Sequence, residues 1–418
     1  MFILKLILTM VIILILVSKK VNIGISLLLG SLSFILLNKA SVLMFLKVVF
    51  QTLTDLEALN LALAIGFITI LGYLMDRYQL MNRMIQSLEN LLGSVKATIV
   101  LAPALIGTLL VSGGALMSCP VVNSLGERIE MSNVHRAASN LVFRHSLYFV
   151  FPLSTTMIIA AQIGGYDLFE FIKLQFPLAI VFSLMGYFLY VRPYSSKALL
   201  NTQIEGIDMH FKSPKLFFQL INFCLYASPI IVSLLSTLIL NLPFSIACIL
   251  GILTTLLVHF TDKHRLDDDE TLLISLKKGV KPLMVLSVFG IMVFKNTLGL
   301  FPDLYDQMAS IVSMGIPIEL IIILCTGLLS FTLASIQPSV AILYPLILPM
   351  AIDEQTKLRL AMFIYTTGFV FYYISPLHLC QVLTVEYFNV DTKSLYKQYR
   401  LILPVVFAVM IGIYLVSA

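Results

Sequence analysis

The sequence predicts an all-α integral membrane protein with about ten transmembrane helices and two re-entrant hairpins. Three observations predict it: an apolar composition, ten long apolar stretches, and Gly and Pro residues that recur at a nearly fixed offset. Of the 418 residues, 59% are hydrophobic and 12% are charged, whereas soluble domains carry roughly 25% charged residues. So few polar side chains cannot coat a water-exposed globule of this length, but a bilayer removes that need.

Charge and cysteine content bear on partners and cofactors. The net charge of +5 is small and follows from membrane topology, so nucleic acid is not expected as a partner. The five cysteines lie in apolar stretches without metal-ligand spacing, and we interpret them as free small hydrophobic residues, with a disulfide or zinc framework as the alternative. They are Cys119, Cys224, Cys248, Cys325 and Cys380. We expect no cofactor and no bound metal.

Ten stretches approach the roughly 20 apolar residues that a helix needs to cross a core of about 30 Å. They are residues 2–17, 21–37, 60–75, 143–163, 168–191, 216–240, 243–260, 282–300, 360–385 and 401–417. The first should be a retained span rather than a signal peptide, because no small-residue cleavage motif follows it. Regions 97–125 and 316–352 are also apolar, but each is broken near its middle by small, polar and Pro residues.

The positive-inside rule orients these spans. If the N-terminus lies outside and each broken region returns to the side from which it came, the cytoplasmic segments hold 20 of the 27 Lys and Arg residues. The reverse orientation would give the opposite bias. Both termini are therefore predicted outside, with a polar cytoplasmic linker at residues 193–215.

Landmark residues recur in order at offsets of 218 to 227 residues. The pairs are Gly30 and Gly251, Gly66 and Gly290, Pro120 and Pro338, Pro152 and Pro376, and Pro177 and Pro404. Chance similarity between apolar helices is the alternative to a duplication. If residues 1–192 and 216–418 are repeats of five crossings each, the second must enter the membrane from the opposite face. Such inverted repeats place substrate and ion sites at their interface, near the midplane.

The two broken regions are predicted to be hairpins, with a polar turn between two ordinary spans as the alternative. In the first, residues 97–111 enter, two glycines permit a reversal, and Pro120 suits the first turn of a returning helix. In the second, Pro317–Leu329 enters, Ser330–Ser339 turns and Val340–Ile352 returns. Such tips offer free amide and carbonyl groups to ions. The candidate ligands are Ser112, Gly113, Gly114, Ser118, Asn123, Thr332, Ser335, Gln337 and Ser339, with Pro120 and Pro338 as helix breakers.

Two long spans contain a proline with polar neighbours. Pro152 precedes Ser154, Thr155 and Thr156, and Pro376 lies between Ser375 and His378. A proline inside a helix removes a hydrogen bond and frees carbonyl groups in the preceding turn. These carbonyls and side chains are candidate Na⁺ or substrate ligands, and ordinary proline kinks are the alternative.

Few ionisable groups are predicted at membrane depth. His378 could bind an anion, carry a proton or be a neutral, hydrogen-bonded histidine. Arg144 and His145 are interpreted as anchors at the cytoplasmic end of their span, with substrate contact as the alternative. All Asp and Glu residues fall outside or at the edges of the spans, and 267–270 is read as a solvated loop. The absence of a carboxylate relay favours Na⁺ over H⁺ as the coupling ion.

The paired hairpins and broken helices resemble the ion transporter superfamily of divalent anion/sodium symporters, gluconate permeases and short-chain carboxylate carriers. Within it, the chain resembles the ten-span prokaryotic family designated domain of unknown function 401. The resemblance implies an elevator-type carrier in the inner membrane, usually a homodimer, whose hairpin tips bind substrate carboxylate and Na⁺. The Ser-Asn-Thr triplet of characterised symporters is absent from both tips, so the resemblance does not support a dicarboxylate.

The sequence thus predicts a secondary active transporter of a small, anionic, carboxylate-like solute, working by Na⁺ symport and alternating access in the lipid bilayer. A channel or a non-transporting membrane assembly protein is the alternative. An intramembrane enzyme is not expected, because no His-Glu-x-x-His motif, Gly-x-Ser-x-Gly motif or pair of intramembrane aspartates is present.

Overall fold

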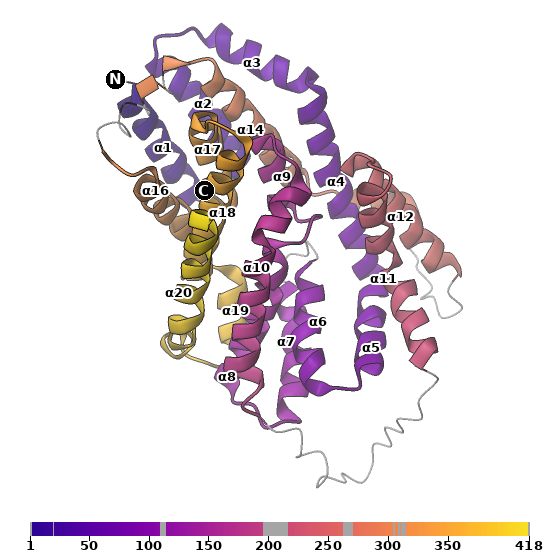
Figure 1. The fold of residues 1–418 in the computed structure, drawn as a ribbon. Helices are drawn as coiled ribbons and strands as arrows, with labels where there is room; N and C mark the ends of the chain where they lie inside the picture. The colour runs from indigo at the N-terminus through magenta and orange to yellow at the C-terminus, as the bar shows by residue number, and fades with distance from the viewer. Residues whose placement is uncertain are drawn as a thin grey trace.

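A computed structural model describes residues 2–19, 21–108, 114–194, 216–261, 271–303, 306–307, 310 and 315–416. Throughout these residues the regular secondary structure is helical and no strand occurs (Figure 1). The predicted all-α class is therefore confirmed. Ser112, Gly113, most of the 193–215 linker and the acidic run 267–270 lie outside the described residues.

The described residues of the first half form ten α-helices. They are α1 (Phe2–Ser18), α2 (Ile23–Leu37), α3 (Val42–Thr54), α4 (Leu56–Arg77), α5 (Leu80–Leu92), α6 (Val95–Gly107), α7 (Gly114–Glu127), α8 (Asn133–Ser146), α9 (Thr155–Gly164) and α10 (Leu168–Gly186). A 3₁₀ turn at Leu147–Phe149 extends α8, and a π-helical turn at Tyr187–Val191 extends α10.

The described part of the second half repeats much of this order. Its helices are α11 (Leu216–Leu238), α12 (Phe244–Thr261), α13 (Leu272–Gly279), α14 (Pro282–Gly299), α16 (Ile318–Leu333), α17 (Gln337–Ile347), α18 (Glu354–Tyr373), α19 (Leu379–Phe388) and α20 (Thr392–Val416). A 3₁₀ turn at Leu348–Met350 follows α17. In Figure 1, α20 rises from the lower to the upper half of the view, where both termini lie.

The ten predicted spans map onto these helices in two groups. Six of them contain helices long and apolar enough to cross a membrane, namely α4, α10, α11, α12, α14 and α20. Two predicted spans form shorter helices, α1 with 17 residues and α2 with 15. At 1.5 Å per residue these helices are about 25 and 22 Å long. The remaining two are the spans with internal prolines, and each is a pair of helices, α8–α9 and α18–α19. The chain is thus a multi-pass membrane protein.

Several predicted boundaries were wrong. Helix α20 begins at Thr392 rather than at residue 401, because its amphipathic first turns carry charge and escape a count of apolar residues. The turn predicted at Ser330–Ser339 is only residues 334–336, since α16 continues through Leu333 despite its hydroxyl residues. Pro120 lies in the middle of α7, whose first residue is Gly114, and not in its first turn. Helices α3, α5 and α13 were missed because they are short and amphipathic.

Two helix pairs join the first half of the chain to the second. Helix α2 packs against α14, and α12 packs against α4. Figure 1 shows α11 and α12 beside α4 and α5 on one side of the molecule. At the first crossing the backbones touch: a Cβ atom added at Gly290 would lie 2.2 Å from the carbonyl oxygen of Gly24. Small residues allow this approach, which lets dispersion forces hold helices together in a membrane.

The hairpins and broken helices form a second body. Helix α6 packs on α8, α16 packs on α18, and α10 packs on α20. The returning limbs cross between halves, because α7 packs on α19 and α17 packs on α9. Each broken helix is therefore held by the hairpin limb of the other half as well as by its own.

The contact between α2 and α14 yields a stability prediction. Gly290→Ala should lower the free energy of unfolding by about 1–3 kcal/mol, because the added methyl group forces two backbones apart. Gly412→Ala in α20 is the matched control, since nothing lies within 4 Å of its added Cβ atom. It should be neutral or stabilising, because alanine favours helix by about 0.5–1 kcal/mol. Thermal unfolding of the purified protein in detergent measures both, and equal melting temperatures would contradict the close crossing.

Candidate functional site

The candidate site lies where two helices are interrupted inside the protein. Between α8 and α9 the chain leaves helical geometry at residues 150–154, and between α18 and α19 it does so at 374–378. Pro152 and Pro376 sit within these breaks, as predicted. Since proline cannot donate a hydrogen bond and clashes with the preceding turn, each residue ends a helix there. We call these segments the first and second break.

The end of α8 brings a positive charge into the protein interior. Arg144 is 6% exposed and His145 is 1% exposed, so the interpretation of both as anchors at the membrane surface was wrong. The reason is that α8 begins at Asn133, ten residues before the predicted span, which moves Arg144 inward by three turns. In the described part of the chain, no other Lys or Arg and no Asp or Glu is buried.

The charge of Arg144 acts on groups from three elements. Its guanidinium group interacts electrostatically with Cys119 of α7, with Tyr148 after α8 and with His378 at the second break. A Cβ atom added at Gly107, at the end of α6, would lie 3.1 Å from the Arg144 side chain. Arg144 therefore sits between the limb leading to the first hairpin tip and the second break.

His378 completes this region from the second half. It is 2% exposed, and neither ring nitrogen makes a hydrogen bond of good geometry among the described residues, although the backbone of Tyr373 lies beside the ring. Its ring packs edge-on against His145, with centroids 4.8 Å apart, and lies tilted against Tyr372, at 4.2 Å. Anion binding, proton transfer and a structural role for His378 all stay predictions.

A buried polar network joins three helices beside this cluster. The amide nitrogen of Asn140 in α8 donates to the hydroxyl oxygen of Thr384 in α19, at 3.0 Å, and to the sulfur of Cys119 in α7, at 3.3 Å. All three side chains are fully buried. The sequence analysis missed Asn140 and Thr384, although an Asn and a Thr inside apolar helices are a signal for interhelical hydrogen bonds.

Three helices begin inside the protein without a capping side chain, as α13, α14 and α16 also do elsewhere. Helix α18 starts at the surface, where the carboxylate of Asp353 accepts from the amide of Thr356, and this hydrogen bond lowers the pKa of Asp353. The N-cap residues of α9, α17 and α19 are Ser154, Ile336 and His378, and none makes a side-chain capping bond. The first amide groups of a helix have no intrahelical acceptor, so these starts are available to an anion.

The second hairpin uses its predicted ligands mainly to hold itself together. The hydroxyl groups of Ser330 and Ser339 lie 2.6 Å apart and are buried. Ser375 of the second break donates to the carbonyl oxygen of Phe331, at 2.6 Å. Thr332 is exposed and bonds to the carbonyl of Leu328 in its own helix. Ser375 thus joins the second break to the hairpin, and the other three hydroxyl groups bond within the hairpin itself.

The second tip also contains Ala334, Ser335, Gln337 and Pro338. The hydroxyl of Ser335 accepts from the amide of Gln337 at 3.3 Å, and both residues are half-buried. Ala334 has a left-handed conformation, with φ of 47°, which reverses the chain. Pro338 lies in the first turn of α17, as predicted.

At the first hairpin, only part of the predicted ligand set lies among the described residues. Gly114 is the first residue of α7, and Ser118 is fully buried within it. Asn123 lies away from the cluster, because it hydrogen-bonds to Arg136 and Glu127 near the ends of α7 and α8. The structure therefore does not bring Asn123 together with the other candidates.

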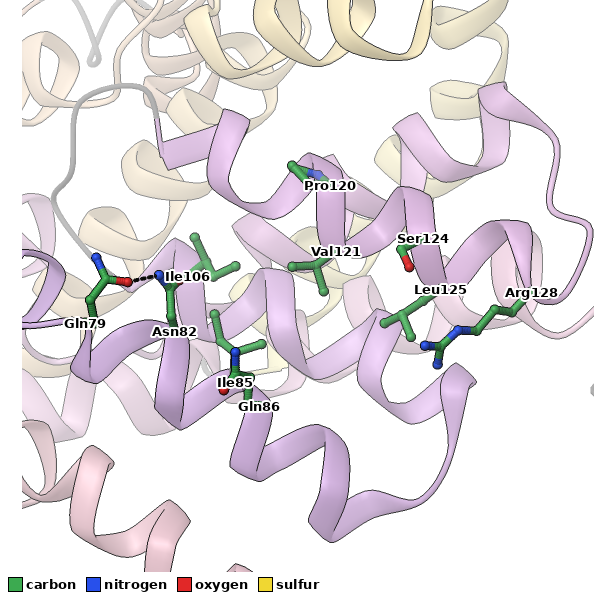
Figure 2. Close-up of a pocket in the computed structure, with 10 residues that line it drawn as sticks. All are labelled: Gln79, Asn82, Ile85, Gln86, Ile106, Pro120, Val121, Ser124, Leu125 and Arg128. Atoms are coloured by element: carbon green, nitrogen blue, oxygen red, sulfur yellow. Dashed lines mark hydrogen bonds between the residues drawn. The ribbon is translucent and has the colours of Figure 1, made fainter. Parts of the chain in front are cut away.

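Two cavities connect the first hairpin with its surroundings. A polar cavity of about 430 Å³ lies between α5 and α7, with Gln79, Asn82 and Gln86 on one side and Ser124 and Arg128 on the other (Figure 2). A small crevice joins Thr108, next to the tip, with Phe151 and Leu153 of the first break and with α4. At that break, Thr155 and Thr156 are buried and Ser154 is half-buried.

Comparisons with known proteins agree with this architecture. The model of a family described as "Protein of unknown function (DUF401)" matches residues 2–417. No curated protein matches the chain in sequence. Among solved structures, the Alcanivorax borkumensis YdaH transporter is similar in fold, with a TM-score of 0.58 and 14% sequence identity over 90% of this chain and 87% of that one.

The polar network around Asn140 yields a prediction. Asn140→Leu keeps the size of the side chain but leaves the Thr384 hydroxyl without its donor, so the free energy of unfolding should fall by about 1–3 kcal/mol. Ser139→Ala is the control on the neighbouring residue, because the buried Ser139 hydroxyl has no hydrogen-bond partner in the described part of the chain and its loss should be neutral or stabilising. Thermal unfolding in detergent compares them. Equal losses would show that the Asn140 bonds contribute nothing specific.

Proposed function

Because the chain belongs to the DUF401 family and has the fold of a membrane transporter, we propose that it is a secondary active transporter of a small organic anion. The observation that carries this proposal is the buried Arg144 at the junction of the two breaks. The solute is carboxylate-like, and its movement is coupled to Na⁺ by alternating access. This makes the protein a carrier rather than an enzyme.

Charge accounts for an anionic solute. A guanidinium group in a water-poor interior attracts a negative charge more strongly than one exposed to water. The described residues bury one guanidinium group and no carboxylate, and arginine recognises carboxylates through two parallel hydrogen bonds. Helix α9 begins eleven residues after Arg144, and no side chain caps its N-terminus. This N-terminus adds amide donors and a partial positive charge. One buried cation matches a solute with one negative charge.

Neutral oxygen ligands support Na⁺ as the coupling ion. The first break combines carbonyl groups of non-helical backbone with the hydroxyl groups of Ser154, Thr155 and Thr156. Unwound backbone of this kind coordinates Na⁺ in transporters with broken helices. A carboxylate proton relay, the usual device of H⁺-driven carriers, has no counterpart among the described residues, because they bury no Asp or Glu. The first break is therefore the proposed Na⁺ site, together with the first hairpin tip.

Matched packing supports inverted repeats and an elevator motion. Contacts of α2 with α14 and of α7 with α19 recur as contacts of α12 with α4 and of α17 with α9. In this proposal α6–α10 and α16–α20 move as one body against the other helices, in a homodimer with both termini outside the inner membrane. The cavity between α5 and α7 lies at the predicted cytoplasmic end and would be the path by which solute reaches the site from that side.

Substitution of Arg144 tests the solute site. In proteoliposomes, Arg144→Gln should lower uptake of a preferred monocarboxylate at least tenfold, a loss of about 1.4 kcal/mol or more, because the charge is gone. Arg144→Lys should retain part of the uptake, because lysine keeps the positive charge but lacks the planar set of hydrogen-bond donors of arginine. Arg400→Gln, at an exposed position of α20, is the control and should transport normally. Undiminished uptake by folded Arg144→Gln protein would rule out this site.

The coupling ion is tested by varying the Na⁺ gradient across the same membranes. Uptake should saturate with solute and rise with inward Na⁺, and Thr155→Val should raise the Na⁺ concentration needed for half-maximal uptake, because it removes a ligand oxygen without changing the shape. Thr9→Val in α1, far from the breaks, is the matched control. Unsaturable flux that ignores Na⁺ and follows the solute gradient would favour the channel alternative.

A further inference from the structure

Three metal-ligating side chains converge where the two halves of the chain meet. They are His145 at the end of α8, His378 at the start of α19 and Cys380 two residues later, and their ligand atoms all lie within 4.8 Å of one another. We propose that these three residues bind a soft, singly charged metal ion, Cu⁺. The assignment does not require the transport function proposed above, because it concerns which ion the cluster holds.

The open ring nitrogens of His378 are the first argument. A neutral imidazole has one donor and one acceptor nitrogen, and a buried polar atom without a partner is destabilising by about 1–3 kcal/mol. Neither nitrogen of His378 makes a hydrogen bond of good geometry among the described residues, although the backbone of Tyr373 lies beside the ring, and the side chain is 98% removed from solvent. A metal ion on one of them would remove part of this penalty.

His145 is oriented as a metal ligand should be. Its Nδ1 atom lies 2.7 Å from the carbonyl oxygen of Leu141. A carbonyl can only accept, so Nδ1 carries the hydrogen and donates, which leaves the lone pair on Nε2. Histidine ligands of metals show this arrangement, in which the second nitrogen donates to a carbonyl or carboxylate. The Tyr372 hydroxyl lies 3.2 Å from Nε2, a long hydrogen bond that a metal could replace.

Cys380 supplies the ligand that determines which metal fits. Thiolate ligands select soft ions such as Cu⁺ and Zn²⁺, and imidazole suits both. The thiol is free and half-buried, so an ion can reach it, and on binding it loses its proton to solvent. The thiolate charge then balances Cu⁺ completely. With Zn²⁺ the site would keep one net positive charge.

The neighbouring charge favours the monovalent ion. Arg144 interacts electrostatically with both His145 and His378, and it is already a buried cation. A second net positive charge would be repelled in a medium of low dielectric constant, whereas a neutral Cu⁺–thiolate centre would not. Three protein ligands also leave a structural Zn²⁺ site one short of its usual four.

The ligands would tie together the two halves of the molecule. His145 ends the helix before the first break, and His378 and Cys380 follow the second break. An ion held by all three joins the two interrupted helices. Metal binding should therefore raise the melting temperature as well as the metal content.

Metal retention by the purified full-length protein tests the proposal. The background carries Cys224→Ser and Cys325→Ser, which removes two accessible thiols outside the cluster. Cu⁺ is supplied with a competing chelator, and Ag⁺ serves as its redox-inert analogue in chloride-free buffer. We expect about one ion per chain, a raised melting temperature, and at least tenfold weaker binding in His378→Asn and in Cys380→Ser. His135→Asn, at the other end of α8, is the control and should bind normally.

X-ray absorption on the Cu⁺-loaded background protein gives an answer that does not depend on the variants folding. The expected first shell is two nitrogen atoms and one sulfur atom. A shell of sulfur alone, or unchanged affinity in folded His378→Asn protein, would overturn the site. Tighter retention of Zn²⁺ than of Cu⁺ by the same residues would overturn the choice of a monovalent ion. None of these measurements involves uptake, so the metal site and the transport proposal fail separately.

Discussion

The structure depends on two interruptions of helix inside the protein. Inside a bilayer every backbone polar group must find a partner within the protein, so non-helical chain survives there only when protein or a wet cavity surrounds it. The breaks at residues 150–154 and 374–378 meet this condition because each is enclosed by both hairpins. The returning limb of one half covers the broken helix of the other. The non-helical backbone is therefore tolerated because the returning hairpin helix of each half packs against the broken helix of the other.

This enclosure also determines which side chains hold the fold and which are left for ligands. Ser375 donates to the carbonyl of Phe331, and Ser330 pairs with Ser339, so the second hairpin is closed by its own hydroxyl groups. At the first break, by contrast, Thr155 and Thr156 begin a helix whose N-cap residue does not cap it. The two halves thus share an architecture but not a chemistry. The hydroxyl groups of the second hairpin close it, whereas the open groups lie at the start of α9 and on the His378 ring.

The sequence predicted those features that depend on local chemistry. Proline inside an apolar span breaks the helix whatever surrounds it, so Pro152 and Pro376 located both breaks. The course of α16 through Ser330 and Thr332 was mispredicted, because hydroxyl residues stay helical when they bond to carbonyls of their own helix or across the hairpin. Arg144 was placed at the surface because hydropathy marks where apolar character begins, and α8 begins ten residues earlier. Whether a charged side chain is buried depends on tertiary packing, so no local pattern in the sequence predicts it.

The same electrostatic constraint connects the two ligands inferred for this region. Around Arg144 the described residues supply one positive charge, two imidazoles and a thiol, with no buried carboxylate. An anion is attracted to such a centre, and a divalent cation is opposed by it. A cation is acceptable only when its own ligand neutralises it, and Cys380 is the residue that can do so. Selection by charge in a water-poor interior therefore leads to a singly charged carboxylate on one side of Arg144 and a thiolate-bound monovalent metal on the other.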